Sequence, residues 1–194
     1  MESQPLSPQE SLNLITEVIT AAKQRQEESG AIYLYWGLII AAVSGAHFVF
    51  QLNGQYEWIP FPYLLIPIAA ILSYFLFPYF RKTKVKNQIG SIINGMWAFS
   101  GFNMMVMGFA LAAELGNHLT PFILILLGIS LGISGLASDN RVLLIAGIIA
   151  NIAGMAGFWI PLDYLPLLMA GVSLGCVMVP GIILNSAYRK RKHV

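Results

Sequence analysis

Apolar residues in this chain are gathered into six long runs that are separated by short polar segments. A helix needs roughly 20 consecutive apolar residues to cross a ~30 Å hydrocarbon core, and the runs are of about that length. The pattern therefore predicts an all-α fold, a polytopic membrane helix bundle with six transmembrane helices. The predicted spans are residues 31–50, 61–80, 92–113, 121–137, 142–160 and 165–185.

The first 30 residues follow a different pattern, in which apolar positions recur with the period of an α-helix. The string SPQE at residues 7–10 has the form of a capping box with proline at the first helical position. The apolar residues that follow fall within one half of the helix circumference: Leu12, Leu14, Ile15, Val18, Ile19, Ala21 and Ala22. We predict a cytoplasmic amphipathic helix here. The predicted organisation is a cytoplasmic segment at 1–30, a transmembrane domain at 31–185 and a basic cytoplasmic tail at 186–194.

Lysine and arginine are distributed unevenly between the predicted loops. Cytoplasmic loops are enriched in these residues, and this bias orients membrane helices. If residues 81–86 lie inside, all 11 lysines and arginines of the chain lie inside as well, and both termini face the cytoplasm. The predicted outer segments contain acidic residues and no lysine or arginine. The predicted topology anchors are Arg81, Lys82, Lys84 and Lys86.

The composition supports a lipid environment and excludes several classes of protein. Charged residues make up 10% of the chain, against about 25% in a soluble domain, and hydrophobic residues make up 57%. The net charge of +2, without a basic helix or zinc-ligand spacing, argues against nucleic acid as a partner. Because Cys176 is the one cysteine, an intramolecular disulfide is excluded.

Small residues within the predicted spans indicate where helices approach each other closely. Glycines four positions apart occur at Gly128 and Gly132 and again at Gly171 and Gly175. We therefore expect the span at 142–160 to lie centrally, against the spans on either side of it in the sequence.

Polar residues within the spans are few. Asn103 shares a predicted helix face with Met107 and Glu114, and Asn151 lies near the middle of its span, where we expect it to hydrogen-bond across the interface. Asn103, Glu114 and Asn151 are the candidates for a polar track. No acidic or basic residue lies deep in any predicted span, which argues against an ion-coupled pump.

Three short strings resemble serine-hydrolase motifs. Residues 128–132 (GISLG) and 171–175 (GVSLG) match the G-x-S-x-G nucleophile elbow, and residues 132–135 (GISG) resemble the serine motif of rhomboid proteases. The elbow requires a strand-to-helix turn, whereas these strings lie in predicted membrane helices. A rhomboid also needs a histidine in its sixth span, and residues 165–185 contain none. We predict no catalytic residue and no enzyme activity, with an intramembrane hydrolase as the alternative.

The predicted outer side gathers five residues that are able to bind a metal or a proton. They are His47, Glu57, Glu114, His118 and Asp163. Their spacing matches no metal-binding motif, so we predict neither a metal site nor a cofactor, and their role is left open at this point.

The C-terminal half of the chain resembles a group of small bacterial membrane proteins. The similar elements are LIAGII at 144–149, a P-x-x-Y turn at 161–164 and VPGIIL at 179–184 before a basic tail. An N-terminal helix that leads into YWG at 35–37 fits the same group. The resemblance implies a six-span protein of the bacterial inner membrane with a cytoplasmic amphipathic helix. The group has no established activity, so it implies no catalytic residue.

Two functions fit these observations. The first is a non-enzymatic accessory or regulatory membrane protein that works through helix contacts, with residues 8–28 packing on the bundle, on a second copy or on a cytoplasmic protein partner. The alternative is a facilitator or carrier of a small neutral or apolar solute, since such a solute needs no buried charge. A cavity lined by Asn103, Met107 and Asn151 would favour the carrier. A solid bundle with an exposed apolar cytoplasmic groove would favour the accessory protein.

Overall fold

The computed structural model describes Gln9, residues 30–76 and residues 88–192. The predicted amphipathic helix at 8–28 and the four predicted topology anchors lie outside the described residues, which contain helices and turns but no strand. The long helices are α2 (Gly30–Leu52), α4 (Leu65–Leu76), α5 (Gln88–Phe109), α7 (Leu119–Ala137), α8 (Arg141–Ala156), α9 (Leu165–Val172) and α10 (Val179–Lys192). Short helices connect them at Tyr56–Trp58, α3 (Pro60–Tyr63), α6 (Ala112–Leu115), Gly116–His118 and Leu162–Tyr164, and a π-helical segment, Ser173–Met178, joins α9 to α10.

Four helical stretches are long and apolar enough to cross a membrane. They are Gly30–Leu52, Tyr56–Ser73, Leu119–Ala137 and Leu162–Ala187. The prediction of an all-α membrane helix bundle is therefore confirmed. The remaining two predicted spans correspond to α5, which has 22 residues, and to α8, which is apolar but has only 16. That these two also cross the membrane stays a prediction.

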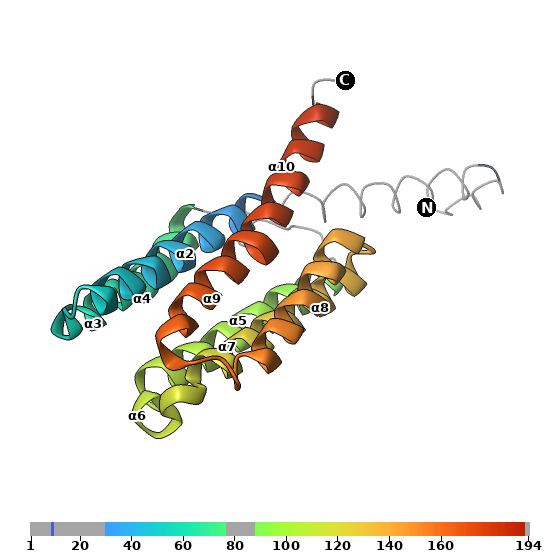
Figure 1. Cartoon of the computed structure of the whole chain (residues 1–194). Coiled ribbons are helices and arrows are strands. Elements are labelled where there is room, and N and C mark those ends of the chain that lie inside the picture. The colour runs from blue at the N-terminus through green and yellow to red at the C-terminus, as the bar shows by residue number, and fades with distance from the viewer. Residues whose placement is uncertain (1–8, 10–29, 77–87, 193–194) are drawn as a thin grey trace.

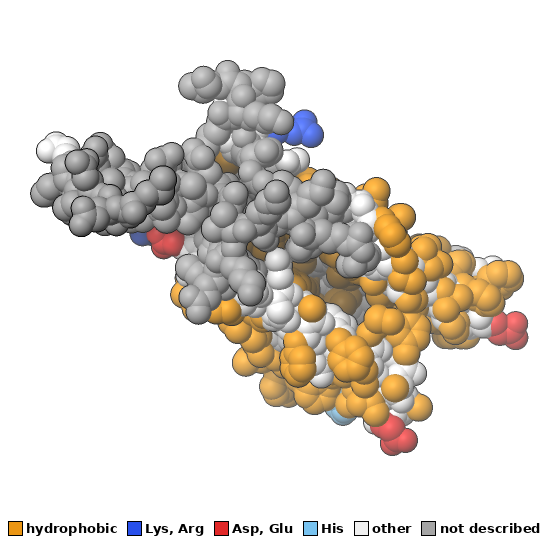
Figure 2. All heavy atoms as spheres, turned by 180° about the vertical axis from the view of Figure 1, so that it is seen from behind, with side chains coloured by type: hydrophobic (Ala, Val, Ile, Leu, Met, Phe, Trp, Pro, Cys, Tyr) orange, Lys and Arg blue, Asp and Glu red, His pale blue; other side chains and the backbone are white. Residues whose placement is uncertain are grey.

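The long helices run alternately up and down, so the turns between them collect at two ends of the molecule (Figure 1). The start of α2, the α7–α8 turn and the C-terminal end of α10 lie at one end, which we call the basic end because it carries the exposed residues Arg141, Arg189 and Lys190. The helices α3 and α6 and the turn before α9 lie at the opposite, acidic end, with exposed Glu57, Glu114 and Asp163. Hydrophobic side chains cover most of the described surface between the two ends (Figure 2).

A tight turn joins α7 to α8. Asp139 adopts a left-handed conformation with φ of 51°, and the amide of Asn140 then donates to the carbonyl of Gly135 at 2.8 Å. This is the arrangement in which a left-handed residue closes a helix C-terminus. The side-chain oxygen of Asn140 accepts from the amides of Val142 at 3.0 Å and Leu143 at 3.2 Å, and so caps the start of α8.

Glycines bring the backbones of α7 and α8 into contact along their length. A Cβ atom placed on Gly128 would lie 2.7 Å from the backbone nitrogen of Asn151, and one placed on Gly147 would lie 2.7 Å from the Cα of Gly132. Near the acidic end, a Cβ on Gly154 would lie 2.9 Å from the nitrogen of Ile125. Only residues without a side chain permit this approach, as the glycine pattern of the sequence predicts.

The helical stretch Leu165–Lys192, which we call the last helix, packs chiefly along α2 and to a lesser extent along α8. A Cβ on Gly30 would lie 2.6 Å from the nitrogen of Asn185, and one on Gly37 would lie 2.8 Å from that of Met178. The expected contact with α8 is present, but it does not run through Gly171 and Gly175. A Cβ on either of these glycines would meet nothing within 4 Å.

The buried core lies where α2, α7, α8 and the last helix meet. Its centre includes Leu124 and Leu131 of α7, Ala150 of α8 and Val177 of the π-helical segment, with Tyr33 of α2 beside them. By contrast, α4 lies at the edge of the bundle and is attached to α2, where the Tyr35 hydroxyl donates to the Ala69 carbonyl at 2.9 Å. Only 6% of the Tyr56–Ser73 stretch is buried, against 44% of α7.

The α7–α8 contact yields a first prediction, in which two facing glycines serve as a matched pair. Gly147→Ala adds a methyl group against the Gly132 backbone, so we expect it to separate the helices and to destabilise the bundle by about 1–3 kcal/mol, the usual cost of overpacking. Gly132→Ala adds the same group into open space and should leave stability nearly unchanged. Thermal unfolding of the detergent-solubilised protein measures both. Equal shifts in Tm for the two variants would contradict the backbone contact.

Candidate functional site

Hydrogen bonds between side chains of different elements form two clusters in the described bundle, one toward each end. The basic-end cluster consists of Tyr33 of α2, Trp97 and Ser100 of α5, and Ser130 and Ser134 of α7. The acidic-end cluster consists of His47 and Gln51 of α2, Tyr63 of α3 and Asp163 of the turn before α9.

The basic-end cluster connects α5 to α7 through side-chain hydrogen bonds and α2 to α5 through an aromatic contact. The Trp97 indole donates through Nε1 to Ser134 Oγ at 2.8 Å, and the Tyr33 ring meets the Trp97 ring edge-on with centroids 5.9 Å apart. Ser134 Oγ donates in turn to the Ser130 carbonyl at 2.8 Å. Ser130 Oγ lies 2.9 Å from both Ser100 Oγ and the Leu126 carbonyl. A hydroxyl has one proton, so Ser130 donates to the carbonyl and accepts from Ser100.

The serines of the hydrolase-like strings are therefore packing residues in this structure. Ser130 and Ser134 are buried within α7 and bonded as just described. Ser173 is fully buried in the π-helical segment and donates to the Gly37 carbonyl of α2 at 3.0 Å. These serines lie on continuous helix, without the strand-to-helix turn that exposes a nucleophile. That the chain has no catalytic residue stays a prediction.

The acidic-end cluster joins α2 to two neighbouring elements. His47 Nδ1 lies 2.7 Å from the Tyr63 hydroxyl, and their rings meet edge-on with centroids 5.7 Å apart. One turn further along α2, Gln51 donates through Nε2 to Asp163 Oδ1 at 2.7 Å. The other amide atom, Gln51 Oε1, is buried and has no hydrogen-bond partner. The cluster ties the α2–α4 hairpin to the start of the last helix.

The five candidate metal ligands do not converge. His47 and Asp163 have the partners just described, while the His118 ring packs against Phe158 with centroids 5.5 Å apart. Glu57 and Glu114 are exposed on separate short helices. Within residues 30–76 and 88–192, no three histidine, cysteine or acidic side chains form a group that is able to hold a metal ion.

The three residues of the predicted polar track are also dispersed. Asn103 donates to the Phe99 carbonyl of its own helix at 2.8 Å. Asn151 donates to the Gly147 carbonyl of its own helix at 3.1 Å instead of across the interface, and its side chain packs on Gly128 of α7. Glu114 does not continue the face of Asn103, because α5 ends at Phe109 and Glu114 belongs to the exposed helix α6.

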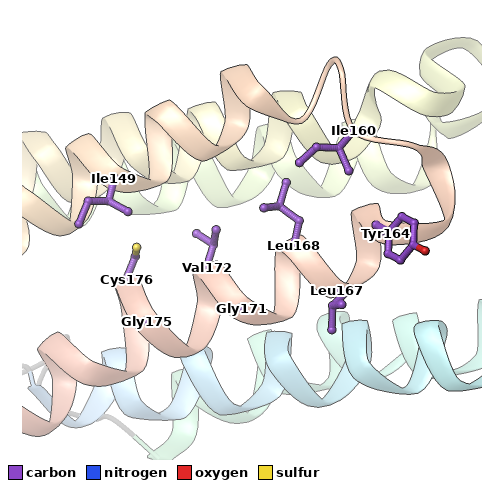
Figure 3. Close-up of a pocket in the computed structure, with 9 residues that line it drawn as sticks. All are labelled: Ile149, Ile160, Tyr164, Leu167, Leu168, Gly171, Val172, Gly175 and Cys176. Atoms are coloured by element: carbon purple, nitrogen blue, oxygen red, sulfur yellow. The ribbon is translucent and has the colours of Figure 1, made fainter.

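The described part of the chain also has a concave surface that the sequence did not predict. It is a groove of about 520 Å³ between α8 and the α9–π-helical stretch, and we call it the lateral groove (Figure 3). Its lining is almost entirely apolar and includes Ile149 of α8, Leu168 of α9 and Cys176 of the π-helical segment. Gly171 and Gly175 form its floor. The glycine spacing was visible in the sequence, but it does not distinguish a helix contact from an open floor.

No protein-family model matches the chain, and no curated protein or solved structure matches it either. Function is therefore inferred from the geometry. The two polar clusters link helices, and the described residues also form two exposed apolar surfaces, the lateral groove and the edge of the bundle at α4.

The basic-end cluster yields a second prediction, a double-mutant cycle on Trp97 and Ser134. Trp97→Phe removes the indole donor, and Ser134→Ala removes its acceptor. We expect a coupling free energy of about 0.6 kcal/mol between the two changes, and at most ~1.7 kcal/mol, as found for hydrogen bonds between membrane helices. Reversible unfolding in mixed micelles measures the wild type, the two single variants and the double variant. Additive effects would show that the Trp97–Ser134 bond carries no stability.

Proposed function

We propose that this protein is a six-span accessory or regulatory subunit of a bacterial inner membrane, which acts through helix contacts and without catalysis. In this proposal α5 and α8 cross the membrane together with the four longer stretches. The basic end, with residues 1–30 and the tail at 186–194, faces the cytoplasm. The acidic end faces the periplasm.

The proposed topology is supported by helix length and by the placement of charged and aromatic residues. α5 has 22 residues and is about 33 Å long at ~1.5 Å per residue, enough for the hydrocarbon core. α8 is shorter, but it packs against α7 along its length, and the turn that follows α8 lies at the same end of the bundle as the start of α7. Exposed Trp58, Trp159 and Tyr164 lie at the acidic end, where aromatic residues mark a membrane interface.

The observation that carries the proposed function is the exposure of α4. Membrane helices associate through close packing and hydrogen bonds, since lipid supplies no hydrophobic gain. Among the described residues, however, the helix stretch Tyr56–Ser73 is 6% buried and rests mainly on α2. Its large side chains Ile68, Ile71 and Leu72 are exposed. A helix held along one edge presents most of its surface to another membrane helix, and we propose that this surface is the subunit contact.

The carrier function has less support from the geometry. It requires a polar or open path between helices, and the residues expected to line one are Asn103, Met107 and Asn151. Asn103 and Asn151 each hydrogen-bond to their own helix, and Asn151 is packed against Gly128 of α7. The lateral groove faces outward and is closed from the inside by the contacts of α8 with the last helix.

The proposed contact on α4 predicts that a bulky substitution there changes assembly. Ile71→Trp should lower the mass of the solubilised protein complex, because the larger ring prevents close approach of the second helix. Ile152→Trp on α8 is the matched control, since the two isoleucines are 64% and 61% exposed. Light scattering in detergent measures the mass of each variant.

Deletion of residues 1–30 tests the cytoplasmic part of the same proposal in the same assay. We expect the deletion to change the oligomeric state of the chain or the set of proteins that copurify with it. If the Ile71→Trp variant and the deletion both leave the mass and the copurifying proteins unchanged, the accessory role through these contacts is wrong.

The proposed topology predicts the side of the membrane from which engineered cysteines react. With Cys176 replaced by alanine, Lys84→Cys should react with a membrane-impermeant maleimide from the cytoplasmic face, and Glu57→Cys from the periplasmic face. Labelling of intact cells and of inverted vesicles compares the two. Periplasmic reactivity at position 84 would overturn the orientation.

A further inference from the structure

We propose that the lateral groove binds one acyl chain of a phospholipid, taken from the membrane leaflet that meets the acidic end. The groove lies on the outward-facing side between α8 and α9, so its occupant enters from the membrane and not from water. Its volume of about 520 Å³ is within the ~300–1,000 Å³ of typical small-molecule sites. The inference is independent of the α4 contact and of which leaflet is periplasmic.

The chemistry of the lining selects a hydrocarbon occupant. Ile149, Leu168 and Val172 form the walls, and the lining is almost entirely apolar. The floor is bare at Gly171 and Gly175, where a Cβ atom would meet nothing within 4 Å. At the glycines of the helix contacts, such as Gly128 and Gly147, the space that a side chain would take is occupied by the neighbouring helix. The described residues thus leave the space above Gly171 and Gly175 open.

The length of the groove favours an acyl chain over another membrane-spanning helix. The groove extends from Tyr164 at the acidic end to Cys176, which is about 18 Å along the axis at ~1.5 Å per residue. One leaflet supplies about 15 Å, half of the ~30 Å hydrocarbon core. The lining of the groove ends at Cys176, and α8 contacts α10, the helix that follows the π-helical segment. A spanning helix would need a groove that continues across the whole core.

The open end of the groove suits the polar end of a lipid. Tyr164 lies there with its hydroxyl directed away from the groove interior (Figure 3), and its side chain is exposed. Tyrosine is enriched at the headgroup level of membranes because its ring is apolar and its hydroxyl is polar. A chain seated with its carboxyl end beside Tyr164 therefore reaches Cys176 with its terminal methyl group.

Photolabelling of the full-length protein in palmitoyl-oleoyl-phosphatidylcholine vesicles tests this proposal. The probes are two phosphatidylcholines that carry a diazirine on one acyl chain, either near the carboxyl end or at the terminal methyl. We expect the first probe to label residues near Leu167 and the second to label Gly175 and Cys176, as mapped by mass spectrometry. If both probes label the same residues of the groove equally, the proposal is overturned.

Filling the groove provides the matched variant. Gly171→Leu combined with Gly175→Leu should abolish labelling at Cys176 by the terminal probe, while labelling at Ile152 on the lipid-facing side of α8 persists. Both glycines have open space, so this variant should fold, and Ile149→Trp fills the groove from the opposite wall as a second variant. Unchanged labelling at Cys176 in both variants would overturn the proposal.

Two further readouts separate this proposal from the α4 contact. The groove variants should keep the mass of the wild-type complex, whereas Ile71→Trp should keep wild-type labelling of the groove. A disulfide between two chains through Gly175→Cys, formed in vesicles with Cys176 replaced by alanine, would show that a second helix occupies the groove and that no lipid does.

Discussion

Direct contact between helix backbones is the interaction on which the rest of this bundle depends. Hydrocarbon solvates leucine as well as another leucine does, so apolar surface alone does not hold membrane helices together. Close approach increases the number of atoms in van der Waals contact, and each such pair contributes only ~0.1–0.2 kcal/mol, so the contact must be long. The glycines of α7 and α8 provide one such contact, and Gly30, Gly37 and Gly181 provide the other, between α2 and the last helix.

Hydrogen bonds between side chains then fix the positions of the helices that glycine contacts do not reach. Three glycines of α5 lie against no neighbour, since a Cβ on Gly95, Gly101 or Gly108 would meet nothing within 4 Å. The helix is held to α7 by Trp97 and Ser100 instead. The serine hydroxyls and the indole of this cluster are hydrogen-bonded to one another and to the backbone of α7.

The sequence predicted the helices well, because the length of an apolar run reports directly on a membrane-crossing helix. It also identified the α7–α8 contact from Gly128 and its neighbours. It did not identify the main partner of the last helix, because Gly171 and Gly175, which have the spacing of a helix contact, are bare, whereas Gly181, which has no glycine four residues away, is packed on α2. The Trp97–Ser134 bond was equally out of reach, since residues 37 positions apart become neighbours only once the helices are arranged. The predicted polar track does not extend from Asn103 to Glu114, because α5 ends at Phe109 and Glu114 belongs to α6.

The short α7–α8 turn bears on how the chain enters the membrane. Asn140 caps α8 as soon as the turn forms, and the contacts nearest the turn, such as that of Gly135 with Leu144, join residues that are close in sequence. Contacts of that kind form early, because little chain entropy is lost in closing a short loop. α8 has only 16 residues and begins with the charged residue Arg141, so by itself it is a weak signal for membrane insertion. In the proposed topology, insertion of α8 therefore depends on α7, which precedes it in the chain and packs against it.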